Sequence, residues 1–116
     1  MSSAAHNLKV EARSVDGTPV VCVRGDVDLH TSPRLRELLL NAARQTAGTL
    51  HIDLSQVPYM DSSGVGTMVY VKRELARDSR PVVLVGLQPR VRSVFEITHL
   101  DKFFRIVANL DEALRE

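Results

Sequence analysis

The chain has 116 residues, a formal net charge of +1 and one cysteine, with 44% apolar and 25% charged residues. These values are typical of one soluble globular domain. They exclude a disulfide-based scaffold and give no support for direct binding of nucleic acid. No apolar run approaches the ~18–20 residues of a membrane span, and the N-terminus lacks a signal-peptide pattern, so we expect a cytoplasmic protein without membrane contact.

The first predicted elements are two antiparallel strands. Residues 1–7 form a predicted flexible tail, and the predicted domain covers 8–116. Apolar and charged residues then alternate from Leu8 to Arg13, which is the period of a strand with one solvent-exposed face. Asp16-Gly17 is a hairpin signal. The second strand covers 20–23 and includes Cys22, which we expect to be a buried, unreactive thiol.

A first helix and then three strand–helix units, the last of them short, are predicted downstream. Thr31 or Ser32 caps the first helix, which has Pro33 in its first turn, and an apolar stripe at i, i+3, i+4 spacing marks its inner face. The further predicted strands cover 50–54, 82–85 and 103–107. The further predicted helices cover 65–77, a segment opened by Pro89, and a short segment capped by Asn109 with Glu112 in the reciprocal position.

This order of elements predicts an α/β fold. Right-handed crossovers give a five-stranded, mostly parallel sheet with an N-terminal antiparallel hairpin. A sheet that is covered on both faces is expected to show continuous apolar runs. The strands at 8–13 and 50–54 alternate instead, so we expect the helices mainly on one face. The strand at 82–85 is apolar throughout, which indicates fuller coverage.

The carboxyl ends of the parallel strands should share one rim, where open α/β sheets bind their partners. Three loops meet there, and their candidate residues are Asp26, Asp28, His30 and Thr31, then 61–66, then 87–90. The stretch 61–66 lies where a helix should begin. Unpaired N–H groups and the positive end of the helix dipole make such a place suitable for an anion or a phosphorylated hydroxyl.

The residues of this helix start also have a purely structural interpretation. Ser62 can be a plain N-cap, worth ~1 kcal/mol, and Asp61 a carboxylate that the dipole favours. Gly64 and Gly66 can permit close packing of the helix on the sheet. Taken alone, these residues favour the cap over a functional role.

Catalytic and cofactor motifs have little support. Gly64-Val65-Gly66 begins like a dinucleotide fingerprint, but Val69 occupies the position of the third glycine. The histidines lack the spacing of metal ligands. A serine hydrolase built from Ser62, His30 and Asp28 is an alternative, although the Gly-x-Ser-x-Gly elbow is absent. We therefore predict that the protein is not an enzyme and has no cofactor of its own.

From about Leu8 to Leu114, the chain resembles the STAS domain family, and within it the single-domain bacterial anti-sigma factor antagonists. The segment 59–66, Tyr-Met-Asp-Ser-Ser-Gly-Val-Gly, reads almost residue for residue like the phosphorylation motif of that family. Gly25-Asp26-Val27-Asp28 with Thr31 resembles its acidic segment before the first helix. His99 stands where relatives often carry glycine, and histidine adopts positive φ more readily than most residues.

The resemblance implies a switch. Ser62, or alternatively Ser63, would accept phosphate from an anti-sigma factor that is also a serine kinase using ATP and Mg²⁺. The unphosphorylated chain, a monomer or weak dimer, would bind that kinase and free its sigma factor, and a PP2C-type phosphatase would restore it. The implied partner-binding residues are Asp28, Thr31, Asp61, Ser62, Ser63, Gly64, Val65 and Gly66. A scaffold or sensor subunit of a stressosome-like assembly is the alternative function.

The charge of a phosphate decides what such a switch does. Phosphorylation adds about −1.5 to −2 charges, which a helix start accommodates, so we expect little change in folding and a large change in binding. Tyr70 and Val71 are expected off the core stripe of the helix at 65–77, where they either extend the contact surface or are scattered exposed apolar residues. The residues expected on its inner face are Val65, Met68, Val69, Lys72, Leu75 and Ala76.

Overall fold

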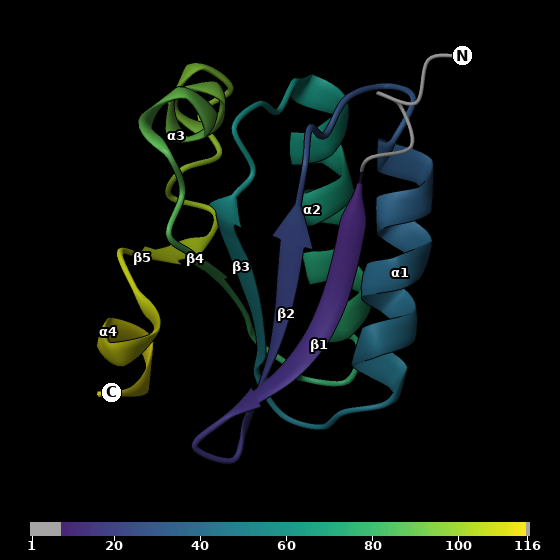
Figure 1. Ribbon diagram of the computed structural model, residues 1–116, viewed down its shortest axis with the longest axis vertical. Coiled ribbons are helices and arrows are strands. Elements are labelled where there is room, and N and C mark those ends of the chain that lie inside the picture. The colour runs from purple at the N-terminus through teal and green to yellow at the C-terminus, as the bar shows by residue number, and fades with distance from the viewer. Residues whose placement is uncertain (1–7, 116) are drawn as a thin grey trace.

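The computed structural model describes residues 8–115. The predicted tail at 1–7 and the last residue of the predicted domain, Glu116, lie outside the described residues. The predicted order of elements is confirmed (Figure 1). The elements are β1 (Lys9–Val15), β2 (Thr18–Arg24), α1 (Ser32–Arg44), β3 (Leu50–Gln56), α2 (Ser62–Ala76), β4 (Val82–Val85), α3 (Pro89–Ile97), β5 (Arg105–Val107) and α4 (Leu110–Leu114).

The five strands form one sheet in the order β1-β2-β3-β4-β5. The β1–β2 pair is antiparallel and the other pairs are parallel, as predicted. Asp16 and Gly17 turn the hairpin with φ values of 51° and 80°. Both values are positive, as a two-residue type I′ turn requires.

The helices divide unequally between the two faces of the sheet. Alternate residues of a strand point to opposite faces. In β4, Leu84 lies in the same core as residues of α1, α2 and α3, whereas Val83 and Val85 pack with Ala113 of α4. Figure 1 shows α1 and α2 side by side along the sheet. The predictions that the helices lie mainly on one face and that β4 is fully covered are both confirmed.

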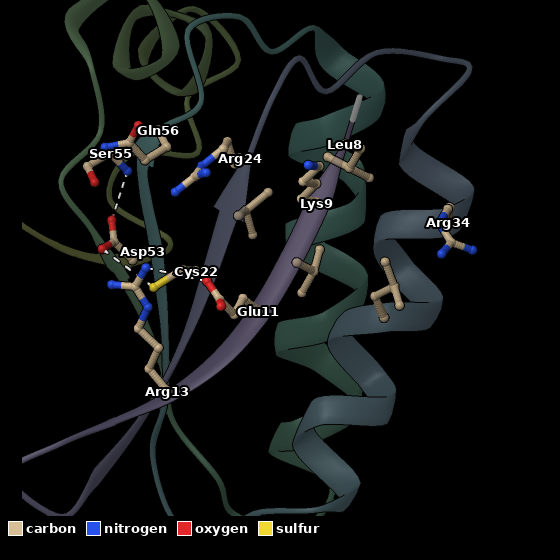
Figure 2. A pocket seen from close by; sticks show the side chains of 13 residues that line it. Leu8, Lys9, Glu11, Arg13, Cys22, Arg24, Arg34, Asp53, Ser55 and Gln56 are labelled. Atoms are coloured by element: carbon tan, nitrogen blue, oxygen red, sulfur yellow. Dashed lines mark hydrogen bonds and ion pairs between the residues drawn. The ribbon is translucent and has the colours of Figure 1, made fainter. Parts of the chain in front are cut away.

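The opposite face of β1, β2 and β3 carries polar and charged side chains. Figure 2 shows Glu11, Arg13, Cys22, Arg24 and Asp53 there, around a hollow of about 610 Å³. Cys22 is therefore only half-buried, and the prediction of a buried thiol is wrong. Burial and the neighbouring Asp53 carboxylate still raise the pKa of the Cys22 thiol. A thiol with a raised pKa forms less of the nucleophilic thiolate, which fits an unreactive group.

In the segment between α3 and β5, the turn after α3 is as predicted, but the start of β5 is not. His99 has φ 60°, so the expected positive-φ turn after α3 is confirmed. The last strand begins at Arg105 and not at Phe103. The Phe103 and Phe104 rings pack edge to face, and the Phe104 and Phe95 rings pack in the same way. These aromatic contacts hold the chain in a turn before it can enter the sheet.

Candidate functional site

A short parallel bridge joins the loops that follow β2 and β3. Val27 bridges Met60. The Val27 N–H donates to the Tyr59 carbonyl at 2.9 Å, and the Asp61 N–H donates to the Val27 carbonyl at 3.1 Å. Val27 and Met60 are both buried. The bridge therefore fixes the loop before α1 against the start of α2, and the predicted convergence of these two loops is confirmed.

Asp61 is the N-cap of α2. Its Oδ1 accepts from the Ser63 backbone N–H at 2.9 Å and from the Ser63 hydroxyl at 2.5 Å. The cap interpretation of Ser62 is therefore wrong, and α2 begins at Ser62, three residues before the predicted start. The extended backbone of Asp61, φ −104° and ψ −172°, is the conformation in which a cap side chain reaches the second N–H of a helix.

The two serines of the helix start differ in what their hydroxyl groups do. The Ser63 side chain is half-buried, and its hydroxyl donates to Asp61. Ser62 is exposed, and within residues 8–115 its hydroxyl forms no hydrogen bond. The free hydroxyl also stands at the positive end of the α2 dipole, where a negative charge is favoured. Of the two serines, Ser62 is thus the one whose hydroxyl is both exposed and free of hydrogen bonds within the described residues.

Asp28 and Thr31 hold the loop between β2 and α1. The Asp28 Oδ1 accepts from the N–H groups of His30 and Thr31 at 2.8 and 3.0 Å. The Thr31 hydroxyl accepts from the Asp28 N–H at 2.9 Å and donates to the Asp26 carbonyl at 3.0 Å. Thr31 is only 3% exposed. Its burial does not fit direct contact with a partner, so it shapes the loop from beneath.

The serine hydrolase alternative does not fit this geometry. A triad needs the carboxylate on the imidazole ring and the imidazole on the serine hydroxyl. Asp28 bonds instead to the backbone N–H of His30. In the part of the chain that the structure describes, no hydrogen bond joins His30 to Ser62. The three residues lie on one rim without forming a catalytic arrangement.

Gly64 and Gly66 have different surroundings. A Cβ on Gly64 would lie 2.5 Å from Met60 Cγ and 2.7 Å from Val27 Cγ1, whereas a Cβ on Gly66 would meet nothing within 4 Å. Close packing is therefore confirmed for Gly64 and wrong for Gly66, which is exposed. Gly64 and the 2%-exposed Val65 support the site from inside and have little surface to offer a partner.

A shallow groove of about 250 Å³ runs between α1 and α2 beside Ser63 and Gly66. Tyr70 lines it and is 40% exposed, as predicted, with the Arg36 guanidinium 4.8 Å from the centre of its ring. Such a cation–π contact orders both side chains. Val71 was expected beside Tyr70 on the surface, and that prediction is wrong because Val71 is fully buried.

A model of the STAS domain matches residues 9–113. The chain belongs to the STAS domain family. An anti-sigma-B factor antagonist from Listeria monocytogenes is 34% identical over 101 residues, which are 86% of this chain and 89% of that protein. The crystal structure of an anti-sigma factor antagonist from Mycobacterium paratuberculosis superposes with a TM-score of 0.83 at 28% identity, covering 94% of this chain and 92% of that one.

A second solved structure represents a modified state. It is the Bacillus cell fate determinant SpoIIAA in its phosphorylated form, with a TM-score of 0.66 and 27% identity over 93% of this chain and 96% of that one. Residues 8–115 contain no group of three or more His, Cys, Asp or Glu side chains placed to hold a metal ion. None of the described helices is long and apolar enough to cross a membrane.

The third predicted loop of the rim borders the end of β3. The Gln88 side-chain amide donates to the Ser55 carbonyl at 2.9 Å, and Arg90 in the first turn of α3 is exposed.

One exposed residue of the rim was not among the residues predicted from the sequence. Leu29 is 72% exposed between Asp28 and His30. The sequence feature that could have pointed to Leu29 is that it is a leucine within a polar loop, outside any periodic apolar stripe.

Proposed function

We propose that this STAS domain is an anti-sigma factor antagonist that phosphorylation of Ser62 switches off. Unphosphorylated, it binds an anti-sigma factor and releases the sigma factor. The anti-sigma factor is also the serine kinase, which uses ATP and Mg²⁺, and a PP2C-type phosphatase restores the antagonist. The protein itself acts in the cytoplasm, as a monomer or weak dimer, and binds no nucleic acid.

One observation carries this proposal: the Ser62 hydroxyl is exposed and unpaired within the described chain, while the neighbouring Ser63 hydroxyl is bonded to Asp61. The relatives support the same function, since the Listeria protein is named an anti-sigma-B factor antagonist and SpoIIAA exists in a phosphorylated form. A hydroxyl that is free of the fold can enter the active site of a kinase without any hydrogen bond of α2 being broken.

The switch follows from charge. A phosphate on Ser62 places about −1.5 to −2 charges next to the Asp61 carboxylate. The helix dipole and first-turn N–H groups accommodate this charge while it is in contact with water. A partner that covers Ser62 has to bury it beside Asp61, and such like-charge contact can cost several kcal/mol.

Phosphopeptide mapping tests which serine is the acceptor. We expect incubation with the cognate anti-sigma factor and Mg²⁺-ATP, followed by peptide mass spectrometry, to place one phosphate on Ser62. Ser62→Ala should take none, and Ser63→Ala should still be modified, although the loss of its bond to Asp61 weakens the cap. Phosphate on Ser63 in the wild type would contradict the assignment. A stable large oligomer that is never phosphorylated would favour the scaffold alternative.

A further inference from the structure

Leu29 lies at the tip of the loop between β2 and α1 and is 72% exposed. Exposed apolar residues are common on protein surfaces and need no explanation when they are scattered. Ile97 at the end of α3 is similarly exposed, at 76%. Leu29 differs from Ile97 in two respects: its loop is held by hydrogen bonds, and that loop is bridged to the segment that leads into Ser62.

The loop that carries Leu29 is held on both sides of it. Asp28 accepts from the N–H groups of His30 and Thr31, and Thr31 bonds back to Asp26 and Asp28. The backbone around Leu29 is therefore fixed before any partner arrives. A loop whose backbone is already fixed loses less conformational entropy on binding than a mobile one, which favours affinity.

Leu29 is close enough to Ser62 to share its interface. Val27 bridges Met60, and Leu29 and Ser62 each follow that pair by two residues. At about 3.6 Å per residue, their Cα atoms are at most about 20 Å apart. A standard interface covers about 800 Å² of each partner, a patch about 30 Å across. One partner surface of this size is therefore large enough to cover both Ser62 and Leu29.

The surroundings define the chemistry of what covers Leu29. Tyr59 and Tyr70, 41% and 40% exposed, add apolar surface on the segments beside Ser62. Asp26 is exposed near the same bridge, and Asp61 is half-buried at the helix start. Basic groups lie here too, since the exposed His30 adjoins Leu29 and the Arg36 guanidinium covers the Tyr70 ring. The complementary surface is therefore an apolar pocket with charged groups of both signs at its edge. Opposite charges across an interface speed association and fix its register.

We propose that Leu29 anchors this chain in an apolar pocket of its anti-sigma factor kinase. The inference rests on the proposed function, because the kinase is the partner that must cover Ser62. Leu29 makes no part of the phosphate-accepting group, so it contributes to binding and not to the transfer of phosphate.

The test compares Leu29→Ala with Ile97→Ala, a control that removes an equally exposed apolar side chain from α3. The probe is the anti-sigma factor kinase from the source organism that binds the wild-type chain. Calorimetry measures the Kd, and steady-state phosphorylation measures kcat and KM. We expect Leu29→Ala to weaken binding about 10- to 100-fold and to raise KM with kcat unchanged. Ile97→Ala should behave as wild type, and both variants should keep the wild-type melting temperature.

The possible results separate the two proposals. Wild-type affinity in Leu29→Ala, together with lost binding in Ser62→Asp, would overturn the role of Leu29 and leave the switch in place. An equal loss in Ile97→Ala would also overturn it. If none of the organism's anti-sigma factor kinases binds or phosphorylates the wild-type chain, the proposed function fails and the assignment of Leu29 fails with it.

Discussion

His51 is a buried imidazole in the middle of β3. It is 6% exposed, pairs in register with Val20 and Val83, and within residues 8–115 its Nδ1 has no hydrogen-bond partner. Burial lowers the pKa of His51, and the Arg105 charge adds to the effect, while a hydrogen bond to the Pro19 backbone acts in the opposite direction. The fold therefore favours the neutral ring.

This lowered pKa predicts how stability depends on pH. As the pH falls through about 6.5, His51 of the unfolded chain takes up a proton while the folded chain does not. The free energy of unfolding should therefore decrease below about pH 6.5, until the pH reaches the lower pKa of the folded state. Urea unfolding at a series of pH values from 8 to 5 measures this decrease.

A pair of variants assigns the pH effect to His51. His51→Leu should reduce the slope of stability against pH in this range, whereas His30→Gln, which changes an exposed histidine, should keep it. An unchanged slope in His51→Leu would show that another group is responsible. The sequence did not reveal this burial, because His51 alternates with Leu50 and Ile52 and was expected on a solvent-exposed face.

The helix start shows a second limit of prediction at the residue scale. Asp61, Ser62 and Ser63 are all residue types that cap helices, so their identities do not decide which one is the cap. The extended backbone of Asp61 decides it, and the bridge between Met60, which precedes Asp61, and Val27 in the loop after the neighbouring strand fixes that backbone. The pattern did correctly place a serine-rich helix start at the rim.

The N-terminal turn of α2 lies directly against the bridged pair. Gly64 is buried against Met60 and Val27, with space for hydrogen but none for a methyl group. Gly66, two residues later, faces open space and is exposed. The two glycines of one helix therefore have opposite roles: one is required for packing, and the other is dispensable for it.

Alanine substitutions should separate these roles. Gly64→Ala should lower the free energy of unfolding by about 1–3 kcal/mol, because Met60 or Val27 must shift. Gly66→Ala should raise it by about 0.5–1 kcal/mol, because alanine restricts the unfolded chain and favours helix. Urea denaturation measures both. If Gly66 belongs to the partner surface, the stabilised Gly66→Ala variant should also bind the anti-sigma factor more weakly.

The result for Gly64→Ala bears on the geometry of the site. A stable Gly64→Ala variant would contradict the tight contact with Met60. A Gly66→Ala variant that is stabilised and binds normally would remove Gly66 from the interface while leaving the packing argument intact.

The inner face of α2 is rotated from the predicted one. Gly64, Thr67 and Val71 are buried, whereas Ala76 is exposed and Lys72 lies over the Phe103 ring at 5.0 Å. The cause is that α2 packs against α1 as well as contributing to the core on the sheet. Predicting the buried face from one apolar stripe assumes that the helix packs against a single neighbour. A helix that packs against more than one neighbour buries a wider face than that stripe indicates.

At the scale of the whole molecule, the fold was predictable because its elements are short, regular and alternate along the chain. Strand and helix periodicity gave their order, and the right-handed crossover rule gave the parallel sheet. The position of α4 on the opposite face was not predictable, because a helix of 5 residues has too little pattern to define a face. Contacts between Ala113 and β4 settle it.

The architecture separates the proposed phosphorylation site from the core. Ser62 lies on the rim, outside the apolar core that α1, α2 and α3 build on the sheet. A charge added there meets water and the helix dipole, and it breaks no packing contact. Binding and folding can therefore respond independently to phosphorylation, which is the central claim of this account.

The most direct test measures affinity for the anti-sigma factor and melting temperature in the same Ser62→Asp variant. The control is Ser93→Asp, which adds the same charge to an exposed serine of α3. We predict that Ser62→Asp loses about 100-fold or more in affinity while its melting temperature stays within about 3 °C of wild type, and that Ser93→Asp changes neither. Wild-type affinity in Ser62→Asp, or a loss that is matched by unfolding, would contradict the account.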